Sequence, residues 1–173
     1  INFFKQFQVK IFKAEKINTH GGSIRIYIKK DKNVKIDKSV NKLIKEEEKF
    51  GIKNFKTYQD FGEKVYKIRE NVIKNLRKLK KNGEIIVGYG APAKATTALN
   101  FFGIKKEIAY IIEDNKLKHK KFIPGVKIPI YSKDKIKKKL PIVLVLAWNF
   151  YDVIKKNNLD LSKNFINIKD LEK

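Results

Sequence analysis

The sequence contains no cysteine and only two histidines among its 173 residues. Without cysteine the chain can form no disulfide and no thiolate metal site, and His20 and His119 alone cannot build a zinc centre. No apolar run reaches the roughly 20 residues that a membrane span needs, and the N-terminal segment has no signal-peptide pattern. We therefore expect a cytoplasmic chain that holds no metal and enters no membrane. Because the first residue is Ile1, we also expect it to be part of a longer protein.

Arginine is scarce as well, with three residues (Arg25, Arg69 and Arg77) among 41 basic ones. The formal net charge of +23 would favour a nucleic-acid-binding protein, since binding to a polyanion releases counterions from its phosphates. Base and phosphate readout, however, usually relies on the bidentate guanidinium group, and the lysines here are spread along the whole sequence. We interpret the charge as a solvated lysine surface and keep a basic nucleic-acid-binding module as an alternative.

The first thirty residues predict a β-hairpin. Apolar residues alternate from Phe7 to Ile11, the pattern breaks at Phe12, and it resumes over Ser23–Ile28 after a Thr-His-Gly-Gly turn. A lone hairpin is only marginally stable in water, so we expect this one to belong to a larger sheet. The rest of the sequence does not obviously supply that sheet. The alternative is that the hairpin packs on the domain that follows.

Residues 31–82 predict a linker and two connecting helices. Asp31–Asp37 is polar, and Ser39 is the expected cap of a short helix that Gly51 ends. The second helix is expected from Thr57 to Asn82-Gly83. Its apolar residues recur at steps of three or four and predict one core-facing stripe, formed by Phe61, Val65, Ile68, Val72, Leu76 and Leu79.

From residue 83 onward, strands and helices alternate. Ile85–Val87 is continuously apolar, which is typical of a strand buried on both faces of a parallel sheet. Further strands are expected at Ile108–Ile112, Ile128–Tyr131, Ile142–Leu146 and Phe165–Ile168. Helices are expected at Ala93–Phe102, in a brief segment capped by Ser132, and in a segment after Phe150 that ends near Asn157. The alternation predicts an α/β fold with a mostly parallel sheet and flanking helices.

The segment Gly83–Asn100, GEIIVGYGAPAKATTALN, predicts a strand that passes through a tight glycine turn into a helix. Unpaired backbone N–H groups and the positive end of the helix dipole at such a turn can hold a phosphate. The glycine pattern is incomplete, because Ala93 stands where the dinucleotide fingerprint has its last glycine. We expect an anion-tolerant turn to which Lys94 adds a point charge, rather than a standard pocket for NAD or S-adenosylmethionine (SAM).

Ligands of open parallel sheets bind beyond the carboxyl ends of the strands. The candidate binding residues are Tyr89, Gly90, Ala91 and Lys94 at the first such end, Glu113 and Asp114 at the second, and Trp148 and Asn149 at the third. Asp114 follows Gly90 by 24 residues, close to the offset of the ribose-binding acid in dinucleotide sites. A free-standing dinucleotide-binding domain of an oxidoreductase is therefore a second alternative.

Each candidate also has a structural interpretation, in which the glycines make the turn and Asp114 caps a helix. Trp148 and Asn149 favour binding more, because an aromatic plate beside an amide can hold a ring. His20 could act as a general base or phosphate ligand, or simply lie in a surface turn. His119, in a run of lysines, is expected to be solvated.

Four segments together resemble a known protein family. They are THGGSIRIY (Thr19–Tyr27), GYGAPAKATTALNFFGI (Gly88–Ile104), IIEDNKLKHKKFIPGVKIPI (Ile111–Ile130) and VLVLAWNF (Val143–Phe150). In this order they look like the C-terminal part of the SAM-dependent C-methyltransferases that act on nucleotide-linked deoxysugars. The resemblance implies a three-part enzyme: an N-terminal zinc domain, a middle SAM-binding domain and a C-terminal Rossmann-like domain that does not bind SAM. The nucleotide-diphosphate sugar would lie between the last two parts.

The resemblance assigns this chain to the third part. Residues 1–30 would be the terminal β-hairpin of the preceding SAM-binding domain, residues 31–82 would connect, and residues 83–173 would form the Rossmann-like domain. SAM, the structural zinc and the catalytic base would lie upstream, in the same or a separate chain, so this fragment would bind no cofactor, carry no catalytic residue and be inactive alone. His20 and Arg25 would face the junction, where they could reach the sugar or fix the interface. Lys94 is assigned to the diphosphate on charge alone.

Overall fold

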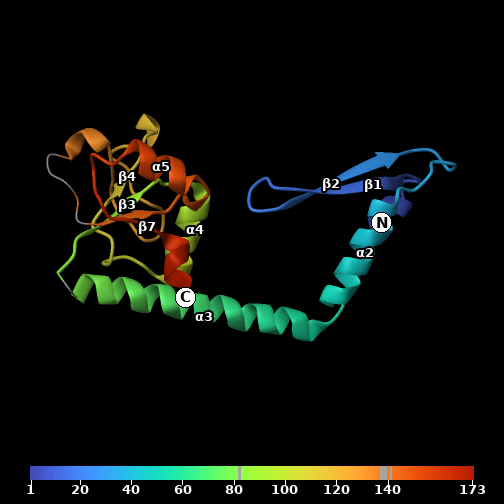
Figure 1. Cartoon of the computed structure of the whole chain (residues 1–173), viewed down its shortest axis with the longest axis horizontal. Coiled ribbons are helices and arrows are strands. Elements are labelled where there is room, and N and C mark those ends of the chain that lie inside the picture. The colour runs from blue at the N-terminus through green and yellow to red at the C-terminus, as the bar shows by residue number, and fades with distance from the viewer. Residues whose placement is uncertain (82, 137–139, 141) are drawn as a thin grey trace. The chain divides into compact units, whose positions relative to one another are not determined.

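The computed structural model describes residues 1–81, 83–136, 140 and 142–173. Contacts divide the chain into two compact units, Ile1–Gly62 and Glu63–Lys173 (Figure 1). The α-helices are α1 (Asn2–Lys5), α2 (Lys38–Phe50), α3 (Phe55–Lys81), α4 (Ala93–Phe102) and α5 (Tyr151–Asn157). The strands are β1 (Lys10–Ile17), β2 (Ser23–Lys29), β3 (Ile86–Tyr89), β4 (Ile111–Ile112), β5 (Ile130–Tyr131), β6 (Ile142–Val145) and β7 (Phe165–Asn167). Short 3-10 helices are η1 (Lys116–Lys118), η2 (Lys133–Lys135), η3 (Trp148–Phe150) and η4 (Ile168–Glu172).

The first unit is an antiparallel hairpin with α2 packed against it. β1 and β2 pair along their whole length, and the register shifts between Ile11 and Lys13. The predicted hairpin is confirmed, but its first strand begins at Lys10 rather than Phe7. The reason is that the preceding residues form α1 and that Gln8 adopts a left-handed backbone with φ +56°. Among the described residues the hairpin is a sheet of two strands only.

The cap of α2 differs from the prediction. Asp37, not Ser39, is the N-cap, and its carboxylate accepts the backbone N–H of Ser39 at 2.8 Å. The Ser39 hydroxyl instead accepts the backbone N–H of Ala14 at 3.1 Å and so ties α2 to β1. The end of the helix is as predicted, since Gly51 adopts φ +81° as its C-cap.

Helix α3 is confirmed but begins at Phe55, two residues before the predicted start. Only the C-terminal part of its apolar stripe faces a core. Val72 and Leu76 are completely buried, with Ile68 and Leu79 packed beside them. Phe61, at the other end of the stripe, is 65% exposed, so the prediction of one continuous core-facing stripe is wrong there.

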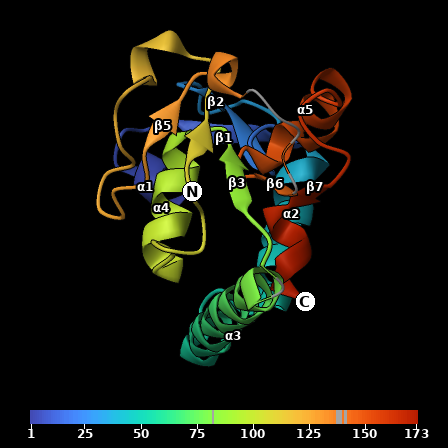
Figure 2. The same ribbon diagram turned by 90° about the vertical axis from the view of Figure 1, so that its left-hand side faces the viewer.

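The second unit contains a five-stranded, all-parallel sheet with the strand order β5-β4-β3-β6-β7. Both faces are covered, as Figure 2 shows, with α4 and α5 on opposite sides. Ile86 of β3 packs with residues of α3 and α4, whereas its neighbour Val87 packs with residues on the α5 side. The predicted α/β fold class is confirmed.

Most element limits in this unit agree with the sequence. Helix α4 has the predicted limits, because Pro92 precedes it and Gly103 ends it at φ +70°. Ile85 is 57% exposed and lies outside β3, which runs from Ile86 to Tyr89. The predicted strand at Ile108–Ile112 is shorter, since regular pairing to β3 covers only Ile111 and Ile112.

Candidate functional site

The sheet order creates a switch point at the carboxyl ends of β3 and β6. From β3 the chain proceeds outward to β4 and β5 on one side, and then returns to β6 and β7 on the other. Open α/β sheets bind ligands at such a reversal. Here the two segments touch: a Cβ added to Gly90 would lie 2.8 Å from Ala147 Cβ. Gly90 has φ +88°, so the turn after β3 needs glycine for both its backbone and its packing.

Tyr89 ends β3 with its side chain turned into a polar cluster. It is 3% exposed, and its hydroxyl lies 2.9 Å from Asp114 Oδ1 and 3.3 Å from Asn158 Oδ1. Burial, reinforced by the hydrogen bond to Asp114, raises the pKa of the Tyr89 phenol above its ordinary value. Tyr89 therefore stays protonated at neutral pH, and its hydroxyl donates a hydrogen bond to Asp114.

Glu113, at the end of β4, folds its carboxylate onto the turn after β3. Glu113 Oε2 accepts the backbone N–H of Ala91 at 2.8 Å, and Oε1 accepts the backbone N–H of Asn115 at 3.0 Å. Lys118 Nζ lies 3.3 Å from the same Oε2 and donates to the Ala91 carbonyl at 2.9 Å. Glu113 and Lys118 thus hold both the N–H and the C=O of Ala91.

The electrostatics of Glu113 reflect these contacts. Burial alone would raise the pKa of its carboxyl, which is 12% exposed. The N–H groups of Asn115 and Ala91, together with the Lys118 ammonium, outweigh burial and hold this pKa below its usual value. The carboxylate is therefore ionised throughout the neutral range.

His119 belongs to the same cluster, and the prediction that it is solvated is wrong. The side chain is half-buried, and Nε2 lies 2.6 Å from the backbone carbonyl oxygen of Glu113. The lysine-rich segment after β4 folds back over the strand end rather than extending into solvent, which explains the difference.

The remaining candidate residues lie in the first turn of α4 and in the segment after β6. Lys94 is exposed in that first turn, and the N-cap of the helix is Pro92, which offers no side-chain cap. Beyond β6, Trp148 is half-buried and packs against the larger core, whereas Asn149 is exposed. The three predicted strand ends therefore lie at one edge of the sheet.

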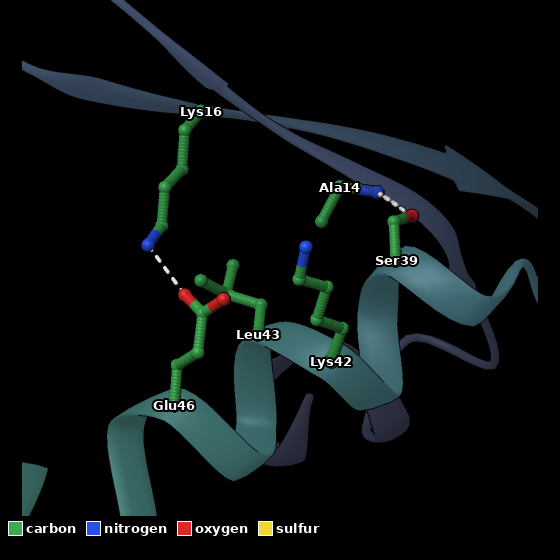
Figure 3. A pocket seen from close by; sticks show the side chains of 6 residues that line it. All are labelled: Ala14, Lys16, Ser39, Lys42, Leu43 and Glu46. Carbon is green, nitrogen blue, oxygen red and sulfur yellow. Dashed lines mark hydrogen bonds and ion pairs between the residues drawn. The ribbon is translucent and has the colours of Figure 1, made fainter. Parts of the chain in front are cut away.

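His20 and Arg25 belong to the first unit. His20 lies in the turn of the hairpin with φ +54°, and Arg25 lies opposite Glu15, with Nη1 4.0 Å from Glu15 Oε2. The same unit contains a pocket of about 220 Å³ between β1 and α2 (Figure 3). Lys16 and Glu46, which both line the pocket, form an ion pair. The pocket therefore lies where α2 packs against the hairpin.

Two classes of site find no support in the described parts of the chain. In residues 1–81, 83–136, 140 and 142–173, no group of three or more His, Asp or Glu side chains could hold a metal ion. No helix in these ranges is long and apolar enough to cross a membrane.

Sequence reasoning missed three residues of this edge, which are Lys118, Lys133 and Asn158. Lys118 was hidden in a lysine run. Lys133 Nζ donates to Asn158 Oδ1 at 3.2 Å, and Asn158 is buried although its position in the sequence indicates a helix end.

Comparison with known proteins agrees with this architecture. C-methyltransferase NovU of Streptomyces niveus is 27% identical over 164 residues, which cover 93% of this chain and 39% of that protein. The chain thus spans about two fifths of this relative. Residues 18–166 match the family described as the C-methyltransferase C-terminal domain. Because this match covers most of the sequence, including the hairpin turn and the whole switch point, the chain belongs to the C-methyltransferase C-terminal domain family.

Proposed function

We propose that this chain is the substrate-binding C-terminal part of a SAM-dependent C-methyltransferase that acts in the cytoplasm on a nucleotide-diphosphate deoxysugar. Membership of the family and likeness to a C-methyltransferase support the enzyme class. Carbon methylation needs a base that removes a proton beside a carbonyl and a methyl donor held in line with the carbanion. In this proposal an upstream part supplies the base, SAM and the structural zinc.

The observation that carries the proposal is the meeting of the turn after β3, which leads into α4, with the segment after β6 at the switch point. Lys94 is exposed in the first turn of α4, which contains no acidic residue. A diphosphate beside it would gain from the ammonium charge and from the positive end of the helix. Trp148 and Asn149, beyond the neighbouring strand, would contact the base or the sugar.

The first unit has a place in the same proposal. Residues 1–30 would complete a sheet of the upstream SAM-binding domain, residues 31–82 would connect the domains, and residues 83–173 would hold the nucleotide. His20 and Arg25 would then lie at the junction between domains. This arrangement would add a larger sheet to a two-stranded hairpin that already packs against α2.

Calorimetric titration of the chain with nucleotide-diphosphate deoxysugars tests the proposal, at about 0.15 M salt to screen the +23 charge. We expect binding that needs the diphosphate and that weakens about fivefold in Lys94→Ala, in line with a single exposed charge-assisted contact. Lys105→Ala is the matched control, because Lys105 is an exposed lysine beyond the opposite end of α4.

Three outcomes would contradict the proposal. Equal weakening in both lysine variants would remove Lys94 from the site. Affinity that falls steeply with salt and shows no preference for nucleotide-sugars would favour the nucleic-acid-binding alternative. Methyl transfer by this chain alone, with SAM and a nucleotide-ketosugar, would show that the base and the donor site are not upstream.

A further inference from the structure

We propose that Glu113 is a built-in anion for the turn after β3: its carboxylate occupies the backbone donor that a phosphate would otherwise use, and Lys118 locks it there. The inference rests on the proposed function only for the identity of the natural ligand. It makes Glu113 a specificity-determining positioning residue, not a substrate contact. Its basis is the pair of bonds from Ala91 N–H and Asn115 N–H to the two carboxylate oxygens.

The position of the carboxylate is that of a bound anion. In a strand-turn-helix of this kind, the N–H groups that follow the glycine point toward an anionic ligand. Here the N–H of Ala91, directly after Gly90, points at Glu113 Oε2 at 2.8 Å. Lys118 Nζ sits 3.3 Å from the same oxygen, as a lysine would beside a phosphate.

The contacts of Glu113 and Lys118 also restrain the backbone of the turn on both sides of Ala91. Glu113 fixes the peptide that precedes Ala91, and Lys118 fixes the peptide that follows it through the Ala91 carbonyl. On the other side, Gly90 N–H donates to the Ile112 carbonyl at 2.8 Å. Because Glu113 already accepts the Ala91 N–H, a ligand must bind outside this turn.

Removal of the carboxylate should open a phosphate site. In Glu113→Ala, the N–H of Ala91 and the Lys118 ammonium lose their common partner, and we expect inorganic pyrophosphate to bind about tenfold more tightly than to wild type. Glu107→Ala is the matched control. This substitution also removes one carboxylate and its charge. The Glu107 carboxylate likewise accepts backbone N–H groups, those of Lys105 and Lys106, but lies before the start of β4. Adding Lys118→Met to Glu113→Ala should abolish the gain.

Amide NMR gives a second readout that does not depend on the stability of a variant. In the wild-type chain, the Ala91 and Asn115 amide protons should shift together as the Glu113 carboxyl is protonated at acid pH. Lys118 contacts this carboxyl directly. The other titratable groups nearby are His119, which contacts the backbone carbonyl of Glu113, and Asp114, which accepts the Tyr89 hydroxyl. In Glu113→Gln this shared transition should be absent.

The outcomes separate this inference from the proposed function. Equal pyrophosphate affinity in Glu113→Ala and Glu107→Ala, or an Ala91 amide that does not follow acidification, would overturn the built-in anion. Pyrophosphate needs no sugar, so a chain that binds no nucleotide-sugar but gains pyrophosphate binding in Glu113→Ala would overturn only the proposed function.

Discussion

The contact between Gly90 and Ala147 at the switch point allows a double-variant test of how the turn is packed. In Gly90→Ala, the new Cβ would lie 2.8 Å from Ala147 Cβ, in a residue with φ +88°. The backbone cannot relax freely, because Gly90 N–H is bonded to Ile112. The left-handed conformation costs a non-glycine residue about 1–2 kcal/mol, and overpacking costs about 1–3 kcal/mol.

A smaller term acts in the opposite direction, because alanine lowers the entropy of the unfolded chain by about 0.4–1 kcal/mol. We therefore expect Gly90→Ala to destabilise the unit by about 2–4 kcal/mol. Adding Ala147→Gly removes the colliding Cβ but not the backbone strain. It should recover about 1–2 kcal/mol as a favourable coupling between the two sites.

Urea unfolding followed by fluorescence measures these differences, because the chain has a single tryptophan, Trp148, next to Ala147. For slopes of about 1–3 kcal/mol per molar, the midpoint for Gly90→Ala should fall by about 1–2 M. Gly103→Ala is the control for backbone strain alone. Its φ is +70°, but an added Cβ would meet only Arg69, at 3.9 Å. A double variant no more stable than Gly90→Ala would refute the packing argument.

Three further predictions concern hydrogen bonds of the second unit. Tyr89→Phe leaves Asp114 without its buried donor and should lower the free energy of unfolding by about 1–2 kcal/mol in urea titrations. Asn100→Ala removes the bond from Asn100 Nδ2 to the Pro124 carbonyl, so amide exchange should accelerate in the segment around Gly125. The lowered pKa of Glu113 means that its stabilisation is present above pH 4.5 and lost as pH falls through the folded pKa; Glu113→Gln should flatten that acid limb.

The sequence predicted the elements of the second unit well because local signals define them. Pro92 and Gly103 bracket α4 on both sides, and uninterrupted apolar runs mark β3 and β6. The strand at Ile108–Ile112 was predicted too long, because burial and regular pairing coincide only at Ile111 and Ile112. Ile108 is buried without being part of a strand. An apolar run thus indicates burial more reliably than it indicates strand ends.

Errors in the first unit arise from tertiary contacts. Ser39 has the right chemistry for a helix cap, but its hydroxyl accepts the N–H of Ala14, 25 residues earlier, and leaves the cap to Asp37. Phe61 continues an unbroken helical stripe, yet periodicity cannot show how far along α3 the core extends. Local patterns predicted the helices and strands of this unit, but not the tertiary contacts of their side chains.

The site was predicted as a set of strand ends, but not as a set of contacts. Glu113 and Tyr89 were interpreted as ligand contacts, and the structure gives both of them internal partners. Whether Glu113 reaches Ala91 depends on β4 lying next to β3, a neighbourhood that one sequence does not reveal. Lys118 was one lysine among many until the fold placed it beside the turn.

The filled turn also bears on the oxidoreductase alternative. A dinucleotide site needs an open backbone donor after the glycines and an acidic residue at the next strand end for the ribose. In this chain Glu113 takes the donor, and Asp114 accepts the Tyr89 hydroxyl. Both acids at this strand end thus already have partners within the protein. We therefore expect no NAD binding by the wild-type chain under conditions where a nucleotide-diphosphate sugar binds, and NAD that competes with the sugar would contradict the substrate-holding role of this edge.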